Sequence, residues 1–84
     1  MKLLKFYADW CGPCKIMKPL AEKIAEEHSL ELVEVNIDNR EDMAREYGVQ
    51  GIPTLVLLDD GNNEISRLIG LQPQAKIASA LGLN

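Results

Sequence analysis

Positive charge is in short supply in this sequence: its 84 residues carry 9 Lys and Arg against 13 Asp and Glu, for a formal net charge of −4. This balance removes the attraction to phosphates that supplies most non-specific affinity for nucleic acids. No Lys/Arg cluster forms a local basic patch either. We therefore expect neither a nucleic acid nor an anionic membrane surface as a partner.

Long apolar runs are also absent from the sequence. Lys5 and Asp9 interrupt the first run well before it reaches the length of a signal-peptide core or of a membrane-spanning helix. We therefore expect a cytoplasmic protein. With 46% apolar and 26% charged residues in 84 positions, the composition is that of one small globular domain covering residues 1–84, which we expect to be a monomer.

Histidine and cysteine are scarce, with one and two copies respectively. A zinc site needs about four ligands, so one Cys pair and the distant His28 exclude a metal centre within a single chain and leave open only one shared between two chains. His28 is expected near the end of a helix, in a capping or solvent-facing role. We predict no metal and no cofactor.

The two cysteines, Cys11 and Cys14, are separated by two residues. A disulfide that closes so short a loop constrains little of the unfolded chain, so it is a poor structural staple. In a cytoplasmic setting the pair is better explained by redox chemistry.

The pattern of apolar residues predicts the element order β-α-β-α-β-β-α. Strands are expected at 2–8, 31–37, 54–58 and 64–69, and helices at 13–27, at 38–47 and from residue 73 onward. Pro19 is expected to kink the first helix without ending it. This helix connects two parallel strands in a right-handed crossover, and the last two strands form a hairpin.

Residues 6–15 read Phe-Tyr-Ala-Asp-Trp-Cys-Gly-Pro-Cys-Lys, and the tripeptide Ile-Pro-Thr follows at 52–54. This combination resembles the thioredoxin family. The resemblance covers nearly the whole chain and includes Pro19, Asn36-Ile37-Asp38, Tyr47-Gly48-Val49, Gly61 and Gly70. Nothing corresponds to the strand and helix that ordinary thioredoxins carry before Phe6, so we expect a short, glutaredoxin-sized member of the family.

The resemblance implies an α/β thioredoxin fold. Its minimal core is a four-stranded mixed sheet in the order second, first, third, fourth, flanked by helices, with the active site at the carboxyl end of the first strand. The order β-α-β-α-β-β-α read from the residues agrees with that topology.

A thiolate rather than a thiol attacks a disulfide, and a helix start lowers a thiol pKa through unpaired backbone N–H groups and the helix dipole. We predict that Cys11 is the nucleophile, with a smaller contribution from Lys15, and that Cys14 resolves the mixed disulfide. In the family, the Gly12-Pro13 spacer accompanies reductants. We therefore predict a reductase of protein disulfides, recycled by a thioredoxin reductase-like protein or another dithiol donor.

The resemblance also implies a substrate groove. Ile52-Pro53 matches a cis peptide bond that lies beside the cysteines in the family, where it presents the backbone of Ile52 to an extended substrate segment. Trp10 and Gly70 border this shallow apolar groove. The alternatives are a simple turn at Pro53 and a surface-packing role for Trp10.

Lys5 lies where the family usually has a buried acid, and Glu34 lies where it often has a lysine. A lysine in the middle of a strand is costly to bury unless it is paired, and Glu34 on the neighbouring parallel strand is its natural partner. We hypothesise that Glu34 transfers the proton during attack by Cys14 and that Lys5 favours the thiolates. The alternatives are a purely structural ion pair and two charges that reach solvent.

Two rival functions belong to other classes. One is a thiol oxidase or disulfide isomerase, against which the Gly-Pro spacer argues. The other is a non-catalytic binding subunit that grips a partner with the surface around Trp10, Ile52 and Gly70.

Overall fold

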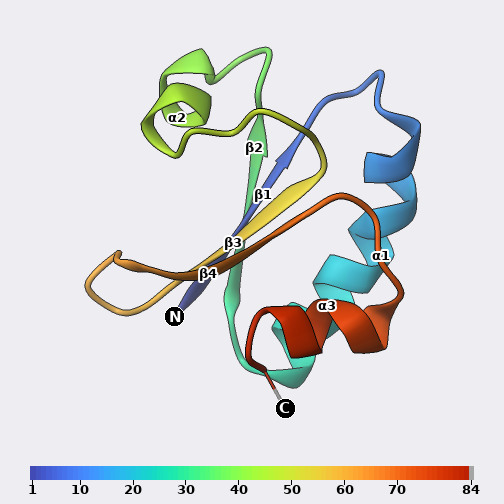
Figure 1. Cartoon of the computed structure of the whole chain (residues 1–84), viewed down its shortest axis with the longest axis vertical. Helices are drawn as coiled ribbons and strands as arrows, with labels where there is room; N and C mark the ends of the chain where they lie inside the picture. The colour runs from blue at the N-terminus through green and yellow to red at the C-terminus, as the bar shows by residue number, and fades with distance from the viewer. Residues whose placement is uncertain (84) are drawn as a thin grey trace.

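The computed structural model describes residues 1–83 and contains four strands and three helices in the predicted order within that range (Figure 1). The last residue of the single predicted domain, Asn84, lies outside the described residues. The elements are β1 (Lys2–Tyr7), α1 (Gly12–Glu27), β2 (Glu31–Asn36), α2 (Glu41–Glu46), β3 (Thr54–Leu58), β4 (Glu64–Ile69) and α3 (Gln74–Ala80).

The strands form one mixed sheet in the order β2-β1-β3-β4, which confirms the predicted topology. β1 pairs with β2 in parallel and with β3 in antiparallel fashion, and β3 pairs with β4 in antiparallel fashion. The helices α1 and α3 cover one face of the sheet, while α2 lies on the other (Figure 1). β1 is therefore a central strand, and its carboxyl end leads directly into the cysteine segment.

Alternation along β1 decides which side chains lie under α1. Successive side chains of a strand point to opposite faces, so Leu3, Lys5 and Tyr7 share the face that α1 covers. Leu3 packs there with residues of α1 and α3, and Phe6 on the opposite face packs with residues on the α2 side. Phe6 and Leu3 are fully buried, which stabilises the fold by about 1.5–3 kcal/mol each.

The second helix begins later than predicted, at residue 41 instead of 38. The Asn36 side chain accepts a hydrogen bond from the Asp38 N–H at 2.9 Å, and the Asn36 carbonyl accepts from Asn39 and Arg40 at 3.0 and 2.9 Å. An asparagine side chain that bonds to the backbone in this way competes with helix formation. The first helix, in contrast, continues through Pro19 as predicted.

All three helices end in the same backbone arrangement. The residue after the helix cap has a positive φ: +62° at Gly48 after α2, +76° at Gly82 after α3 and +55° at Ser29 after α1. In each case its N–H, and that of the next residue, donate back to carbonyl groups of the last helical turn. Only after α1 does a residue with a side chain occupy this left-handed position.

We expect Ser29→Gly to stabilise the protein by about 0.5–1 kcal/mol. The left-handed conformation costs an L-residue about 1–2 kcal/mol, and the larger unfolded-state entropy of glycine offsets part of the gain. Thermal unfolding should show a rise of roughly 2–8 °C in Tm for a chain of this size. Ser29→Ala is the matched control, because it keeps the Cβ and should give no gain; an equal gain for both variants would contradict this explanation.

Candidate active site

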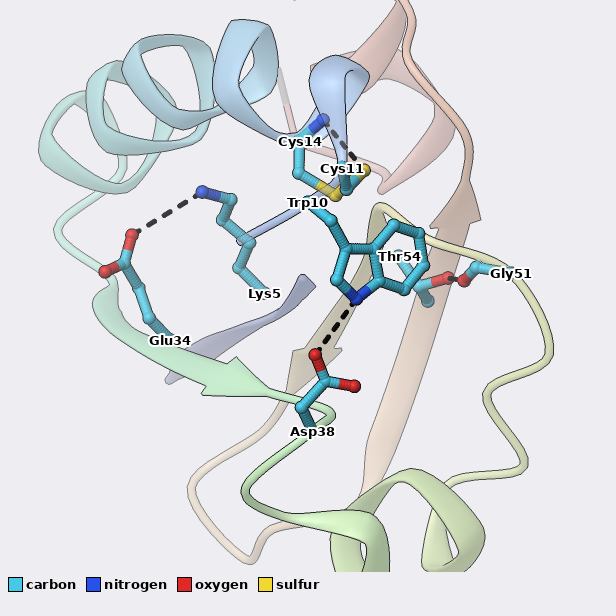
Figure 2. Close-up of a disulfide and its surroundings, with 8 residues drawn as sticks. All are labelled: Lys5, Trp10, Cys11, Cys14, Glu34, Asp38, Gly51 and Thr54. Atoms are coloured by element: carbon cyan, nitrogen blue, oxygen red, sulfur yellow. Dashed lines mark hydrogen bonds and ion pairs between the residues drawn. A yellow bond between two sulfur atoms is a disulfide. The ribbon is translucent and has the colours of Figure 1, made fainter. Parts of the chain in front are cut away.

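The two cysteines lie where β1 passes into α1 and are joined in a disulfide (Figure 2). Cys11 is the N-cap of α1, Gly12 is the first residue of the helix, and Pro13 lies in the first turn. The Cys14 N–H donates a hydrogen bond to Cys11 Sγ at 3.1 Å. An N–H donor and the positive end of the helix dipole both favour negative charge on this sulfur once the disulfide is reduced.

The disulfide is covered on most sides. Cys11 is 5% exposed and Cys14 is 2% exposed. Cys14 is therefore the less exposed of the two, as expected for a resolving thiol, but the difference is small. Ala8 packs with both cysteines, and Tyr7, Ile37 and Ile52 pack around this cluster. An external thiol can therefore reach the disulfide only through the small exposed part of Cys11.

A second segment meets the cysteines from the start of β3. The Ile52–Pro53 peptide bond is cis, as the resemblance implied, and Ile52 packs against the cysteine cluster. The Pro53 carbonyl accepts a hydrogen bond from the Gly70 N–H at 2.8 Å, which holds Gly70 beside this segment. Among residues 1–83, no backbone group forms a hydrogen bond with the N–H or C=O of Ile52. Both groups are therefore free to pair with an extended chain.

Trp10 borders the site on the α2 side and is 69% exposed. Its indole Nε1–H donates a hydrogen bond to Asp38 Oδ2 at 3.0 Å (Figure 2). Asp38 was not among the predicted site residues. The sequence could have indicated this contact. Trp10 and Asp38 each follow one of two parallel neighbouring strands, and the carboxyl ends of such strands meet at the same edge of the sheet.

Lys5 and Glu34 are direct register partners on β1 and β2, and Lys5 Nζ lies 3.6 Å from Glu34 Oε1 (Figure 2). The Lys5 side chain is 3% exposed and that of Glu34 is 34% exposed, so the alternative in which both charges reach solvent is wrong for Lys5. Burial lowers the pKa of Lys5, and the attraction of Glu34 offsets this only in part. The Lys5 ammonium also lies 5.1 Å from the centroid of the Tyr7 ring, a favourable cation–π distance.

A cavity of about 410 Å³ lies between this ion pair and Cys14. Its lining includes Lys5, Glu34 and Cys14, together with Lys15 and Lys18 of α1. The sequence showed no basic cluster, but the fold gathers three lysines around one cavity. Helical spacing places Lys15 and Lys18 together, and strand alternation directs Lys5 toward the same helix.

Other candidate features are absent or peripheral. Residues 1–83 contain no group of three or more His, Cys, Asp and Glu side chains that could hold a metal ion. His28 is the C-cap of α1, which confirms its predicted place at a helix end. In the same part of the chain, no helix combines the length and the apolar character needed to cross a membrane.

Comparison with known proteins agrees with this geometry. The family model described as Thioredoxin matches residues 1–82. The chain is 38% identical over 84 residues to a thioredoxin of Pseudomonas aeruginosa, covering 98% of this chain and 77% of that protein. It is 46% identical over 71 residues to a thioredoxin of Chlamydia caviae, covering 83% and 69% respectively.

Solved structures show the same likeness. A mutant thioredoxin of Halobacterium salinarum superimposes with a TM-score of 0.82 at 38% identity, covering 98% of this chain and 75% of that one. Mitochondrial thioredoxin 3 of Saccharomyces cerevisiae, in its oxidised form, gives a TM-score of 0.82 at 35% identity, covering 96% and 76%. With a Cys-Gly-Pro-Cys pair joined in a disulfide at the start of α1, the chain belongs to the thioredoxin family and is a dithiol–disulfide oxidoreductase that reduces disulfides.

Proposed function

We propose that the protein is a cytoplasmic electron carrier in cellular redox homeostasis that reduces disulfides of protein substrates. A thioredoxin reductase-like protein or another dithiol donor recycles it, and it acts as a monomer made of one domain, residues 1–84. The observation that carries the proposal is the hydrogen bond from the Cys14 N–H to Cys11 Sγ at the N-terminus of α1. This arrangement supports a low pKa for the Cys11 thiol in the reduced protein.

The first step forms a mixed disulfide. The Cys11 thiolate attacks one sulfur of the substrate disulfide, so a Cys11–substrate bond forms, the substrate S–S bond breaks and the leaving thiolate takes a proton from solvent. In the second step the Cys14 thiolate attacks Cys11 Sγ, so the Cys11–Cys14 bond forms and the Cys11–substrate bond breaks. The second substrate sulfur leaves as a thiolate and takes a proton from solvent. The two electrons that reduce the substrate come from the dithiol, which ends as the Cys11–Cys14 disulfide.

The second step requires that Cys14 lose its proton. We assign this proton transfer to Glu34, acting through water in the cavity that both residues line. The buried ammonium of Lys5 lines the same cavity and favours the thiolate form of Cys14. Lys5 thus acts on the charge of the thiol, while Glu34 acts on its proton.

Substrate binding is assigned to the surface around the disulfide. The free backbone groups of Ile52, beside Pro53, support pairing with an extended substrate segment in β fashion. Trp10, Gly12 and Pro13 are exposed beside Cys11 and border the groove there, and Gly70, whose N–H donates to the Pro53 carbonyl, borders it beside Ile52.

The test of this proposal is the redox potential of the Cys11–Cys14 couple. Equilibration in graded thiol–disulfide buffers, followed by trapping of free thiols and mass spectrometry, gives the potential directly. We expect a value near that of thioredoxin, about −270 mV, because the Gly12-Pro13 spacer accompanies reductants in the family. A value between about −120 and −180 mV would instead support an oxidase or isomerase.

A further inference from the structure

We propose that the cavity beside Cys14 binds a carboxylate of the substrate, so that the protein reduces disulfides flanked by an acidic group in preference to neutral or basic ones. The inference rests on the proposed function, because it assumes that the substrate sulfur attaches to Cys11. It adds a substrate class to that function.

The first observation is the state of the Lys5 ammonium. Its side chain is only 3% exposed, and its amino group faces a cavity instead of packing into the apolar core. The separation of 3.6 Å between Lys5 Nζ and Glu34 Oε1 is long for an ion pair, and this carboxylate faces at most one of the N–H donors of the ammonium. An ammonium group has three N–H donors, so donors of Lys5 remain for a group inside the cavity besides the one directed at Glu34. Donors of a largely buried cation that face a cavity favour an anion at this place.

The second observation is the balance of charge around the cavity. Lys5, Lys15 and Lys18 line it, against two carboxylates, those of Asp9 and Glu34, which leaves an excess of one positive charge. Neither Lys15 nor Lys18 forms an ion pair within residues 1–83. The side chains that line the cavity therefore carry a net charge opposite in sign to that of the whole chain, which is −4, and Glu22 of α1, which does not line the cavity, offsets part of this excess. A local field of this kind raises the encounter rate with groups of opposite charge.

The third observation is the distance from the reacting sulfur. Cys14 lines the cavity, and its Cα lies 5.3 Å from that of Cys11, which would carry the substrate. An extended chain advances about 3.3–3.6 Å per residue, so one or two residues span the distance from Cys11 to the edge of the cavity that Cys14 lines. The volume of about 410 Å³ lies in the range of pockets that hold small ligands.

Two sources could supply such a carboxylate: an acidic side chain of a protein, or the carboxylates of a small anionic disulfide. The experiment compares second-order rate constants for oxidation of the reduced protein by a panel of disulfides. Three of them are peptide disulfides that are identical except for Glu, Gln or Lys two residues from the cysteine. The others are glutathione disulfide, which is anionic, and hydroxyethyl disulfide, which is neutral.

We expect the Glu peptide to react about two- to fivefold faster than the Gln peptide, and the Lys peptide to react more slowly than either. The preference should shrink when the ionic strength rises from about 0.01 to 1 M, because the screening length falls from about 30 to 3 Å. Lys18→Gln should reduce the preference, because it removes one of the three lysines that line the cavity. Lys23→Gln is the matched control, since Lys23 is an exposed lysine of the same helix that does not line the cavity.

The outcomes separate the possibilities. A preference for the Glu peptide supports an acidic protein substrate, and a preference confined to glutathione disulfide supports a small anionic one. Equal rates for the three peptides and for the two small disulfides would overturn the inference. So would a preference that Lys18→Gln leaves unchanged, or one that Lys23→Gln reduces equally, since the latter reflects only net charge. Failure of the proposed function is a different result, because hydroxyethyl disulfide would then also remain unreduced.

Discussion

Replacing Cys14 with serine should stop the reaction at the mixed disulfide between Cys11 and the substrate. The first step needs only the Cys11 thiolate, which is held at the N-cap of α1, but release of the product needs a second sulfur at Cys14. Turnover should therefore be abolished while a covalent adduct accumulates. Mass spectrometry of the variant mixed with a peptide disulfide measures the adduct, whose mass is that of the protein plus half of the disulfide.

Cys11→Ser is the matched control for this prediction. It removes the nucleophile, so it should abolish turnover without forming any adduct. If Cys11→Ser forms the adduct and Cys14→Ser does not, the roles of nucleophile and resolving thiol are exchanged. If the protein with both cysteines replaced by serine keeps its function in the cell, the surface around Trp10, Ile52 and Gly70 acts as a binding module and the cysteines are incidental.

Most of the fold could be predicted because local patterns and tertiary packing agree. The strands at 54–58 and 64–69 are found at their predicted bounds, since a continuous apolar run, a turn rich in Asp, Gly and Asn, and a second strand specify a hairpin. The start of α2 was not predictable from apolar spacing. It follows the turn around Asn36, whose side chain accepts a hydrogen bond from the Asp38 N–H and competes with the helix.

The site was predictable where it is contiguous in sequence and less so where it is assembled in space. Cys11, Gly12, Pro13 and Cys14 form one motif. The bond between Trp10 and Asp38 joins segments that are 28 residues apart, and it forms because their strands are parallel neighbours. The charge of the cavity depends on which face of the sheet the Lys5 side chain lies on, as well as on the place of Lys5 in the sequence. The sequence indicated the charge at this position but not that the cavity also gathers Lys15 and Lys18.

The Lys5–Glu34 pair carries the second large prediction. Glu34→Gln keeps the shape of the side chain but removes its proton-accepting group, so the resolving step should slow by about 10²-fold at pH 7. This is the low end of the usual range for acid–base catalysis, because Glu34 is 34% exposed and water can take part of its role. The measurement is stopped-flow release of the second thionitrobenzoate after mixing the reduced protein with an aromatic disulfide that carries this leaving group.

A purely structural ion pair would give a different pattern. If Glu34 only balances the charge of Lys5, the second release should keep its rate in Glu34→Gln, and that result would remove the proposed role. If Glu34 transfers the proton, a small exogenous base such as imidazole should restore part of the lost rate. Lys5→Met tests the role of the cation apart from that of Glu34. Without the ammonium, the thiol pKa of Cys14 should rise, and the pH profile of the resolving step should therefore move to higher pH.

Stability of the oxidised protein gives an independent readout, because its cysteines do not titrate. Lys5→Met replaces a buried cation with an apolar side chain of similar length. It leaves Glu34 without its partner, but the Glu34 side chain is 34% exposed and keeps contact with water, so we expect the variant to be at least as stable as the parent protein. Glu34→Gln leaves the cation without its partner and should destabilise by less than the roughly 3–5 kcal/mol of a dry site, because Lys5 faces a cavity.

The pH dependence of this difference follows from the lowered pKa of Lys5, whose burial outweighs the attraction of Glu34. Below its folded-state pKa, Lys5 is protonated in both states, and the folded protein bears the full desolvation of the cation. As pH rises from that pKa toward 10.5, the folded protein releases the proton while the unfolded chain retains it, so the free energy of unfolding increases. Lys5→Met lacks this increase, and its advantage over the parent protein should shrink with rising pH in denaturant titrations. A constant advantage across that range would mean that Lys5 keeps its ordinary pKa, and that the cavity already solvates its ammonium as fully as water does.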